Sequence, residues 1–402
     1  GLGWRSMKRG PMAKGQASAV RRGIGVQLNP RPVPETGRRA TAPVDHTGSD
    51  TDTRRSADDA GTRPTSATTH HRSRVHRIEM PVSTCTWAAR RWVAMGSTAE
   101  LLVWARNPEV LADHAVAAVE RLEAEWSRFR TSSALVALNR RAGTGPQRVS
   151  GALATALRRA HEAFLLTDGR FDPTVLGALC ALGYDRTFAE VSRRTDLHTD
   201  LAGATVVPLG FDAVEMVDDH DSLLVTIPHG ITLDLGGIGK GLACDLVVDE
   251  LAMRGAVSIC LSLGGDIRVS GPGPDADGAW PIPVEDPRTT RVAFEFQLLD
   301  EAIAQSTTLI RRWQCTDGRD AHHVIDPSTG RPSEHAVAAV VCATNAWEAD
   351  VLAKAALVAD RTAALALVTR AGGDLWLFEA DGSLHTTPAV VDTIETTVPC
   401  RS

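Results

Sequence analysis

The chain has 402 residues, enough for two or three domains, and its formal net charge of −6 is unevenly distributed. No apolar run approaches the ~20 residues that cross a bilayer, and no secretory apolar core follows the early positive charges. The seven cysteines have no Cys-x-x-Cys spacing, which indicates reduced thiols, buried at Cys180, Cys260 and Cys342. We therefore expect a cytoplasmic protein without a transmembrane segment.

The first 80 residues differ from the rest of the chain. They carry 15 Lys and Arg against 7 Asp and Glu, whereas the remaining residues carry 28 against 42. This part lacks apolar periodicity and cannot bury a core, so we expect a disordered basic extension over residues 1–80. A basic tail is able to touch nucleic acid, but an unstructured extension explains it more simply, and we expect no nucleic-acid partner. Met80 directly precedes the first patterned segment and is expected as an alternative start. The folded domain is expected over residues 81–395.

Hydrophobic periodicity predicts strands and helices in mixed order over the folded part. In chain order these are a hairpin within 89–106 around Gly96, a helix at 109–128, a short helix from its cap Ser133 to Asn139, and a helix at 150–166. Strands follow at 213–217, 223–227 and 231–235, then a helix at 242–254 and strands within 257–270. The last elements are a hairpin of 292–299 with 301–306, a strand at 336–343, a helix from Asn345 to Val358 with Glu348 in a capping box, and a hairpin within 374–386. This order favours an α+β fold over a doubly wound sheet.

The most informative segment runs from Ile231 to Gly241 and indicates a strand, a glycine turn and the start of a helix. Glycines let a ligand approach the main chain, and a helix N-terminus attracts anions. We therefore predict a phosphate site, to which Asp234 and Lys240 add polar groups. It is not a Walker loop, because Asp234 stands where that loop has its first glycine and Gly241 follows the lysine. A turn that merely joins a strand to a helix remains the alternative.

Three more segments place polar side chains in unusual turns, although each alone is compatible with an ordinary turn. They are Asp168-Gly169-Arg170-Phe171-Asp172-Pro173-Thr174-Val175, Ser262-Leu263-Gly264-Gly265-Asp266-Ile267-Arg268, and His322-His323-Val324-Ile325-Asp326-Pro327-Ser328-Thr329-Gly330-Arg331-Pro332.

Taken together and in this order, the segments resemble the ApbE family of FAD:protein FMN transferases over about residues 90–390. The same resemblance includes Met95-Gly96-Ser97, the block from Glu125-Trp126-Ser127-Arg128-Phe129 to Leu138-Asn139, and Ala349-Asp350. It implies a fold similar to a tandem T-fold, with antiparallel sheets backed by helices. It also implies that FAD is cleaved with a divalent metal, usually Mg²⁺, that FMN is attached to a Ser or Thr hydroxyl of a target protein, and that AMP is released.

The resemblance further implies roles for individual positions. Eight residues fall where the family contacts FAD: Met95, Phe129, Arg170, Phe171, Asp172, Asp234, Lys240 and Val324. Gly237 falls where a backbone carbonyl meets the metal, and Asp350 where a carboxylate does. His323 matches a histidine near the reacting phosphate and is the candidate general base, because a neutral histidine accepts a proton near pH 7. Asp266 is the second candidate catalytic residue.

One position departs from the family pattern. The family usually has a Thr metal ligand four residues after the aspartate, and Lys354 stands there. On a helix Asp350 and Lys354 lie on one face, so they form either a surface ion pair worth ~0.3–0.5 kcal/mol or a cluster in which the ammonium takes the metal's place. Protonated lysine has no lone pair to offer, and we expect weakened or altered metal binding. Two alternatives to the transferase stay open: an FAD-binding protein without transfer, and an FAD pyrophosphatase that gives FMN and AMP.

Overall fold

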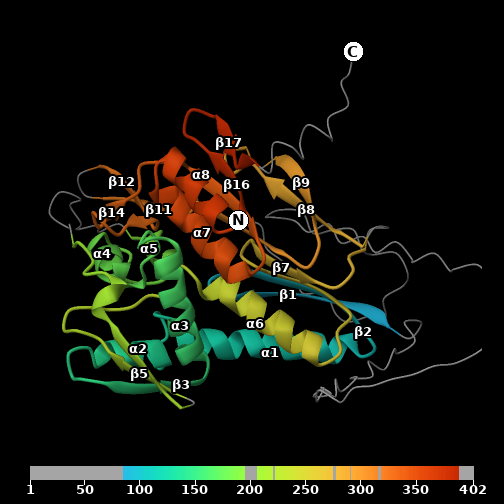
Figure 1. Ribbon diagram of the computed structural model, residues 1–402, viewed down its shortest axis with the longest axis horizontal. Helices are drawn as coiled ribbons and strands as arrows, with labels where there is room; N and C mark the ends of the chain where they lie inside the picture. Colours follow the sequence, from blue (N-terminus) through green and yellow to red (C-terminus); the bar gives the residue numbers. More distant parts are fainter. Residues whose placement is uncertain are drawn as a thin grey trace, which may run out of the picture. The chain divides into compact units, whose positions relative to one another are not determined.

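The structure, a computed structural model, describes residues 85–194, 206–220, 222–274, 278–289, 291–315 and 318–388. The expected basic extension and the expected start at Met80 lie outside these residues. The described part is built on an eight-stranded sheet in the order β1-β2-β6-β7-β10-β15-β16-β17 (Figure 1). Every neighbouring pair in this sheet is antiparallel. The predicted α+β class is confirmed.

The sheet has two halves with the same order of elements: strand, strand, helix, helix, strand, strand. The first half consists of β1 (Thr86–Ala94), β2 (Ser97–Ala105), α1 (Pro108–Trp126), α6 (Gly239–Met253), β6 (Ser258–Leu263) and β7 (Asp266–Ser270). The second consists of β10 (Ala302–Thr307), β15 (Ala338–Ala343), α7 (Ala346–Val358), α8 (Arg361–Arg370), β16 (Asp374–Phe378) and β17 (Leu384–Thr386). This duplication agrees with the expected tandem T-fold.

Both faces of the sheet are covered. Helices α1 and α6 pack on the first half, α7 and α8 on the second, and α6 contacts α7 where the halves meet (Figure 1). The opposite face packs against the hairpin of β8 (Trp280–Glu285) and β9 (Val292–Leu298). In β8 every second residue is buried, as expected for a strand with one face on a core. Strands such as β6 are consequently buried along their whole length.

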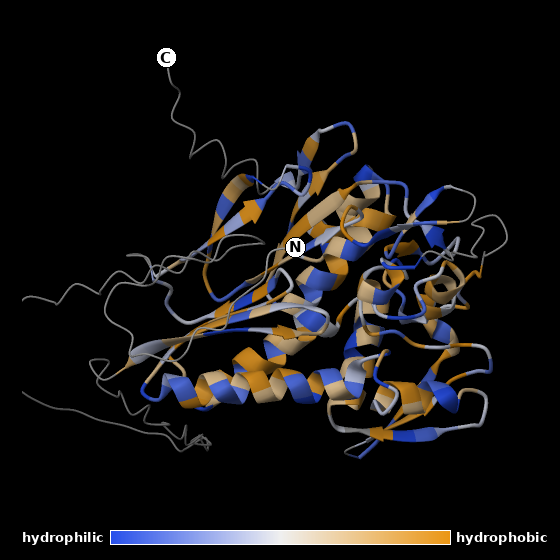
Figure 2. Ribbon diagram, turned by 180° about the vertical axis from the view of Figure 1, so that it is seen from behind, coloured by the Kyte–Doolittle hydropathy of each residue, from blue (hydrophilic) through white to orange (hydrophobic). Residues whose placement is uncertain are grey.

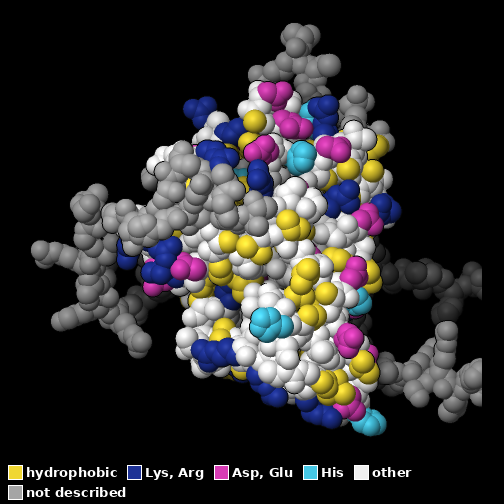
Figure 3. All heavy atoms as spheres, turned by 90° about the vertical axis from the view of Figure 1, so that its left-hand side faces the viewer, with side chains coloured by type: hydrophobic (Ala, Val, Ile, Leu, Met, Phe, Trp, Pro, Cys, Tyr) yellow, Lys and Arg dark blue, Asp and Glu magenta, His cyan; other side chains and the backbone are white. Residues whose placement is uncertain are grey.

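Smaller elements extend one end of the sheet. Helices α2 (Ala134–Arg140) and α3 (Gly151–Leu166) accompany a three-stranded sheet of β3 (Gln147–Ser150), β5 (Ser222–Thr226) and β4 (Glu215–Asp219). Beside them lie the 3-10 helices η2 (Pro173–Val175) and η3 (Phe211–Ala213), the short helices α4 (Leu176–Ala181) and α5 (Phe188–Val191), and the ribbons β11 (Arg312–Gln314) with β12 (Asp320–His322) and β13 (Ile325–Asp326) with β14 (Arg331–Pro332). Figure 3 views this end, where hydrophobic side chains spread over the centre and basic side chains gather above and below.

Elements with strong local signals are confirmed. These are the hairpin around Gly96, helices α1, α3 and α7, and the closing hairpin. Ser133 caps α2 as predicted, because its Oγ accepts a hydrogen bond from the Val136 N–H at 3.1 Å. Figure 2 shows hydrophobic and hydrophilic residues recurring along α1, which is the periodicity that predicted it.

The predicted hairpin of 292–299 with 301–306 is wrong. Strand β9 pairs with β8, and β10 pairs with β7 and β15. The error follows from the strand β8, which the sequence analysis did not predict. Its Pro281 and Pro283 argue against a strand, because proline has no N–H to donate to a neighbouring strand.

The expected strand at 231–235 is also wrong. The Leu233 N–H donates to the Asn139 side chain at 2.8 Å, the Asn139 amide returns a bond to the Leu233 carbonyl at 2.9 Å, and the Asp234 N–H donates to the Pro173 carbonyl at 2.8 Å. The backbone groups of this segment are therefore satisfied outside any strand. Helix α6 begins earlier than predicted, at Gly239, so that Lys240 lies in its first turn.

The capping box predicted at the start of α7 is absent, since Asn345 makes no side-chain cap. Asp245 of α6 takes its place and accepts hydrogen bonds from the N–H groups of Ala346 at 2.9 Å and Trp347 at 2.8 Å. A residue of the neighbouring helix thus replaces the local cap, and nothing in the sequence around α7 signals it.

The thiol prediction holds only in part. The cysteines within the described ranges are free, and Cys260 is buried, but Cys180 is exposed and Cys342 is half-buried. Cys180 lies near the end of short helix α4, in which Ala178 and Leu179 are the buried residues. Among the helices of the described part, none has both the length and the apolar character that a bilayer crossing requires.

Candidate functional site

A cavity of about 680 Å³ opens where the first turn of α6 meets the segments around α4, α5 and β13. Its volume falls in the range of ~300–1,000 Å³ that is usual for small-molecule sites. All eight residues predicted to contact FAD line it, and so do His323 and Gly237. Residues as far apart in the chain as Met95 and Val324 therefore meet at one site.

The glycine turn before α6 gives the cavity a bare stretch of main chain. A Cβ on Gly237 would lie 2.8 Å from Cε2 of Phe171, closer than real contacts allow, so a larger residue fits here only if the Phe171 ring shifts. The helix start offers fewer free amides than expected. The Gly239 N–H donates to the Leu235 carbonyl at 2.7 Å, and the Gly241 N–H donates to Asp350 Oδ2 at 3.3 Å. Anion attraction at this end consequently depends mainly on side-chain cations.

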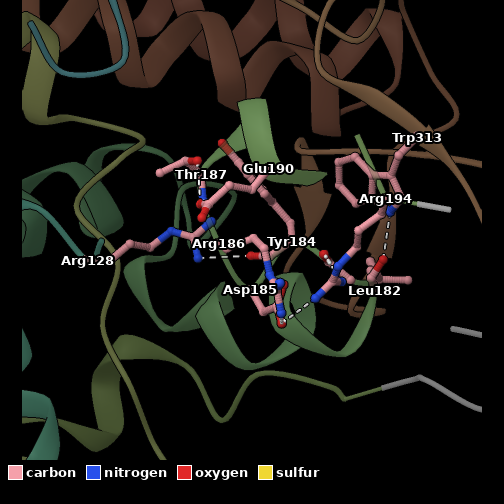
Figure 4. Close-up of polar contacts among 10 residues, drawn as sticks. Arg128, Leu182, Tyr184, Asp185, Arg186, Thr187, Glu190, Arg194 and Trp313 are labelled. Carbon is pink, nitrogen blue, oxygen red and sulfur yellow. Dashed lines mark hydrogen bonds and ion pairs between the residues drawn. The ribbon is translucent and has the colours of Figure 1, made fainter. Parts of the chain in front are cut away.

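Asp234 and Arg128 form a buried clamp on one side of the cavity. Asp234 Oδ1 accepts the Gly236 N–H at 2.9 Å, and its Oδ2 lies 3.3 Å from Arg128 Nε. The Arg128 guanidinium lies 4.2 Å from the ring centroid of Phe129 and 4.5 Å from that of Tyr184. It also donates to the Tyr184 carbonyl at 2.9 Å (Figure 4). Arg128 therefore fixes two aromatic rings of the cavity wall relative to the glycine turn.

A network behind this clamp holds the loop between α4 and α5 (Figure 4). Trp313 Nε1 donates to the Leu182 carbonyl at 2.7 Å, and Arg194 pairs with Asp185 at 2.9 Å. A capping box of Thr187 and Glu190 starts α5. The loop presents Tyr184 and Phe188 to the cavity with their ring centroids 6.2 Å apart. The aromatic wall is thereby built on fixed backbone.

Asp172 and Arg170 flank Phe171, whose ring lies beside the glycine turn. Asp172 Oδ1 accepts hydrogen bonds from the Thr174 N–H at 2.8 Å and the Thr174 hydroxyl at 2.7 Å, so it caps η2. Burial raises the pKa of Asp172, and these hydrogen bonds oppose the rise. Arg170 lies 3.6 Å from Asp168 and is partly exposed at the rim. Asp172 thus holds the turn that carries Phe171.

The two adjacent histidines differ in their surroundings. His322 Nε2 lies 2.9 Å from the Ser333 carbonyl, and its Nδ1 accepts the Val324 N–H at 3.3 Å, so both ring nitrogens are engaged in the fold. His323 lines the cavity, and its buried Nδ1 has no hydrogen-bond partner among the described residues. Desolvation lowers the pKa of His323 well below 6.5, and the charges of Arg311 and Lys354 lower it further. His323 is therefore neutral at pH 7 and carries an unused nitrogen.

Four charged side chains meet beneath the glycine turn. We call Lys240, Lys354, Asp266 and Asp350 the lysine–aspartate cluster. Lys240 Nζ contacts the Asp266 carboxylate and lies 4.0 Å from Asp350 Oδ1, and Lys354 Nζ contacts the same Asp350 oxygen. Asp266 and Asp350 are both 0% exposed. The interpretation of Asp350 and Lys354 as a surface ion pair is therefore wrong.

Protonation in the cluster follows from burial and charge. Burial raises the pKa of Asp266, and the neighbouring Asp350 raises it further against the effect of Lys240. Burial alone would raise the pKa of Asp350 too, but Lys240 and Lys354 hold it below its usual value. The two carboxylates raise the pKa of Lys240 despite its burial, so it stays charged. Asp266 does not line the cavity and reaches it only through Lys240.

The residues around Asp350 do not fit the divalent metal that the sequence resemblance implies. Asp350 Oδ1 is held by Lys354 and faces Lys240, while its Oδ2 accepts the Gly241 N–H. A divalent cation at Asp350 would compete with Lys354 for Oδ1, and the two ammonium groups would offset the attraction of Asp350 and Asp266 for it. Among the side chains that the structure describes, no three His, Cys, Asp or Glu residues converge as ligands.

Several cavity residues were not predicted as binding residues. Arg128 stood inside a quoted motif, and its position between aromatic residues at a helix end was an available signal. Tyr184, Phe188 and Arg311 carried no signal of spacing or motif, because loops distant in sequence bring them to the cavity.

Comparison with known proteins agrees with this geometry. A model of the ApbE family matches residues 95–376. The FAD:protein FMN transferase of Salmonella typhimurium is 30% identical over 268 residues, which cover 64% of this chain and 74% of that protein. The FAD:protein FMN transferase of Treponema pallidum is 28% identical over 331 residues, which cover 76% and 88%.

Solved structures give the same result. The crystal structure of the ApbE protein from Thermotoga maritima is similar with a TM-score of 0.67 at 26% identity, and covers 76% of this chain and 98% of that one. The flavin transferase ApbE from Vibrio cholerae is similar with a TM-score of 0.63 at 25% identity, and covers 77% and 99%. The matched span 95–376 contains every residue that lines the cavity. Because the family model matches most of the chain, this chain belongs to the ApbE family.

Proposed function

We propose that the chain is an FAD:protein FMN transferase, which cleaves FAD, attaches FMN to a Ser or Thr hydroxyl of an acceptor protein and releases AMP. One observation carries the proposal: the eight predicted FAD contacts and His323 line a single cavity of about 680 Å³. Family membership and the similarity to FAD:protein FMN transferases support it.

The cavity has aromatic residues that suit the flat ring systems of a dinucleotide and basic residues that suit its diphosphate. Phe129, Phe171 and Tyr184 offer apolar ring faces for the isoalloxazine or the adenine. Lys240, Lys354 and Arg311 offer positive charge for the diphosphate between them. The bare main chain at Gly237 lets the diphosphate lie close to the backbone.

The proposed reaction balances without any redox partner. The acceptor hydroxyl oxygen forms a bond to the phosphorus on the FMN side of the diphosphate, and the bond from that phosphorus to the bridging oxygen breaks. AMP leaves with the bridging oxygen. His323 accepts the hydroxyl proton, for which its neutral state and its place in the cavity wall suit it. Cationic side chains offset the charge that develops on the phosphoryl oxygens.

Asp266 acts in this scheme as a positioning residue. It is fully buried behind Lys240 and holds the ammonium at the cavity wall. For Mg²⁺, Gly237 and Asp350 were the expected ligands, and the ammonium groups beside Asp350 argue against them in this chain. We further propose a cytoplasmic location with an acceptor protein exposed to the cytoplasm, and no role in nucleic-acid binding.

A single incubation separates the transferase from its alternatives. The purified chain is mixed with FAD and a flavin-acceptor domain that carries a Ser or Thr target, and the products are analysed by mass spectrometry. The transferase predicts an acceptor that carries FMN, with one AMP for each FMN bound. Free FMN with AMP and an unmodified acceptor indicates a pyrophosphatase, and retained intact FAD indicates a binding protein; either result contradicts the proposal.

A further inference from the structure

We infer that the Lys354 ammonium takes the place of a divalent cation in this chain, so that FAD binds and reacts without added metal. The inference rests on the proposed function, because it concerns how the diphosphate of FAD is neutralised. It has four supports: where the Lys354 side chain runs, which N–H donor it leaves unused, which other cations line the cavity, and how lysine is distributed in the chain.

The Lys354 side chain runs through the space between the two expected metal ligands. A Cβ built on Gly237 would lie 3.5 Å from Lys354 Cδ, so the alkyl chain passes directly beside the Gly237 backbone. Its Nζ contacts Asp350 Oδ1. Lys354 therefore lies beside Gly237 with its alkyl chain and against Asp350 with its ammonium, and these are the two residues expected to hold the metal.

The ammonium keeps a donor for a ligand. Lysine has three N–H groups. Lys354 Nζ donates to Asp350 Oδ1 and, at 3.3 Å, to the Asp350 carbonyl. It lines the cavity, and the structure records no third partner for it within the described residues, which leaves one N–H for a phosphate oxygen.

Side chains also supply positive charge at the cavity. A divalent ion brings two positive charges and Lys354 brings one, but Arg311 adds another on the same wall. Arg311, Lys354 and Lys240 all line the cavity together with His323, and their charges lower the pKa of that histidine.

The use of lysine in this chain is selective. The chain has 43 Lys and Arg, and only four of these are lysines, at positions 8, 14, 240 and 354. Both lysines beyond residue 80 belong to the lysine–aspartate cluster, while the other cations there are arginines. Lys354 pairs with the fully buried Asp350, and a compact ammonium group suits this place better than the broad guanidinium of arginine. Lys354 is therefore matched to this position and is not an ordinary surface cation.

The test measures FAD affinity of the full-length chain by fluorescence quenching, once in excess EDTA and once in millimolar MgCl₂. We expect the wild-type dissociation constants in the two buffers to agree. Binding that needs MgCl₂ overturns the inference and leaves the proposed function intact. Absence of binding in both buffers contradicts the proposed function itself, so the two failures are distinguishable.

Two variants sharpen the test. Lys354→Thr supplies an oxygen ligand and removes the ammonium, so FAD binding weakens about tenfold or more in EDTA and recovers in MgCl₂. Lys354→Met supplies neither, so binding is weak in both buffers. Circular dichroism checks that each variant is folded. Equal metal response in the wild type and in Lys354→Thr contradicts the inference.

A readout independent of FAD uses Mn²⁺ alone. Electron paramagnetic resonance measures free Mn²⁺ as protein is added. We expect the wild type to leave the free signal unchanged and Lys354→Thr to reduce it. Stoichiometric Mn²⁺ binding by the wild type, abolished by Asp350→Asn, overturns the inference even if a variant fails to fold.

Discussion

His323 and Lys240 line the same cavity, but the pKa of His323 is lowered and that of Lys240 is raised. Desolvation and nearby cations lower the pKa of His323, which keeps the imidazole neutral. Lys240 is also removed from water, but Asp266 and Asp350 raise its pKa and keep the ammonium charged. The cavity therefore holds a neutral imidazole and a cation together at neutral pH, a combination that suits the proposed phosphoryl transfer from a diphosphate to a hydroxyl.

Replacing the base is the first prediction at this scale. His323→Gln should lower FMN transfer by about 10²–10⁴-fold while FAD still binds, because the variant loses proton acceptance but keeps the cationic wall. Transfer rate and FAD affinity are measured separately. His322→Gln is the matched control and should lower stability more than turnover, since His322 bonds to the Ser333 carbonyl. A His323 variant with full transfer rate excludes the base role.

The pH profile gives a second prediction. A histidine whose pKa lies well below 6.5 stays unprotonated as pH falls through 6.5, so the transfer rate should stay level there and decline only at lower pH. The same shift means that stability decreases as pH falls below 6.5, because the unfolded chain takes up the proton first. Rate measurements across this range check it. Half-loss of activity at or above pH 6.5, absent in His323→Gln, contradicts the assignment.

A substitution at Gly237 tests whether FAD binds against the exposed main chain of the glycine turn. Gly237→Val should weaken FAD binding about tenfold or more, because its Cβ would lie 2.8 Å from Phe171 and push that ring into the cavity. Gly177→Ala in α4 is the control, since its Cβ would make only an ordinary contact at 3.5 Å with Val206. Calorimetry with FAD measures both. Unchanged affinity of the valine variant places the diphosphate elsewhere.

At the scale of elements, the contact of α6 with α7 assembles the lysine–aspartate cluster. Lys240 lies on α6 and Lys354 on α7. A Cβ on Gly241 would lie 2.3 Å from the Ala346 carbonyl oxygen, so the glycine is what lets α7 begin directly against α6. Asp245 completes the junction by accepting the first two N–H groups of α7. The two halves of the sheet thus contribute one lysine each.

Asp245→Ala should therefore destabilise the fold by about 1–3 kcal/mol, because it leaves two N–H groups at the start of α7 unpaired. Urea denaturation measures the loss. Asp249→Ala, an exposed position on the same helix, is the control and should be nearly neutral.

The loss should also depend on pH. Burial raises the pKa of Asp245 from 3.8 to about 6, against the hydrogen bonds from Ala346 and Trp347. Between these values the folded chain binds the proton more readily than the unfolded chain, so the stability contributed by Asp245 increases as pH falls from 6 towards 3.8. The difference between wild type and Asp245→Ala should be larger midway in this window than at neutral pH. The reverse trend rules out the assigned shift.

Elements were predictable where local pattern determined them. The periodicity of α1 and α3 and the cap at Ser133 were sufficient. Prediction failed where distant groups decide: Asn139 satisfies the backbone at Leu233, and Asp245 caps α7 from another helix. Strand β8 was not predicted because its two prolines argue against a strand, although every second residue of it is buried.

At the scale of the whole molecule, motif order located the cavity but not its complete wall. The predicted residues met there because motifs sit at turns that face one another across the fold. The aromatic wall of Tyr184 and Phe188 depends on the network around α5, in which residues such as Trp313 lie far along the chain. Such contacts arise only from tertiary packing.

The most direct test of the account is a calorimetric titration of the full-length chain with FAD and, in parallel, with FMN. The account predicts saturable one-to-one binding of FAD, at least about tenfold tighter than FMN, because a single phosphate leaves part of the cationic wall unpaired. No heat with FAD from a demonstrably folded chain, or equal affinity for FAD and FMN, would contradict it.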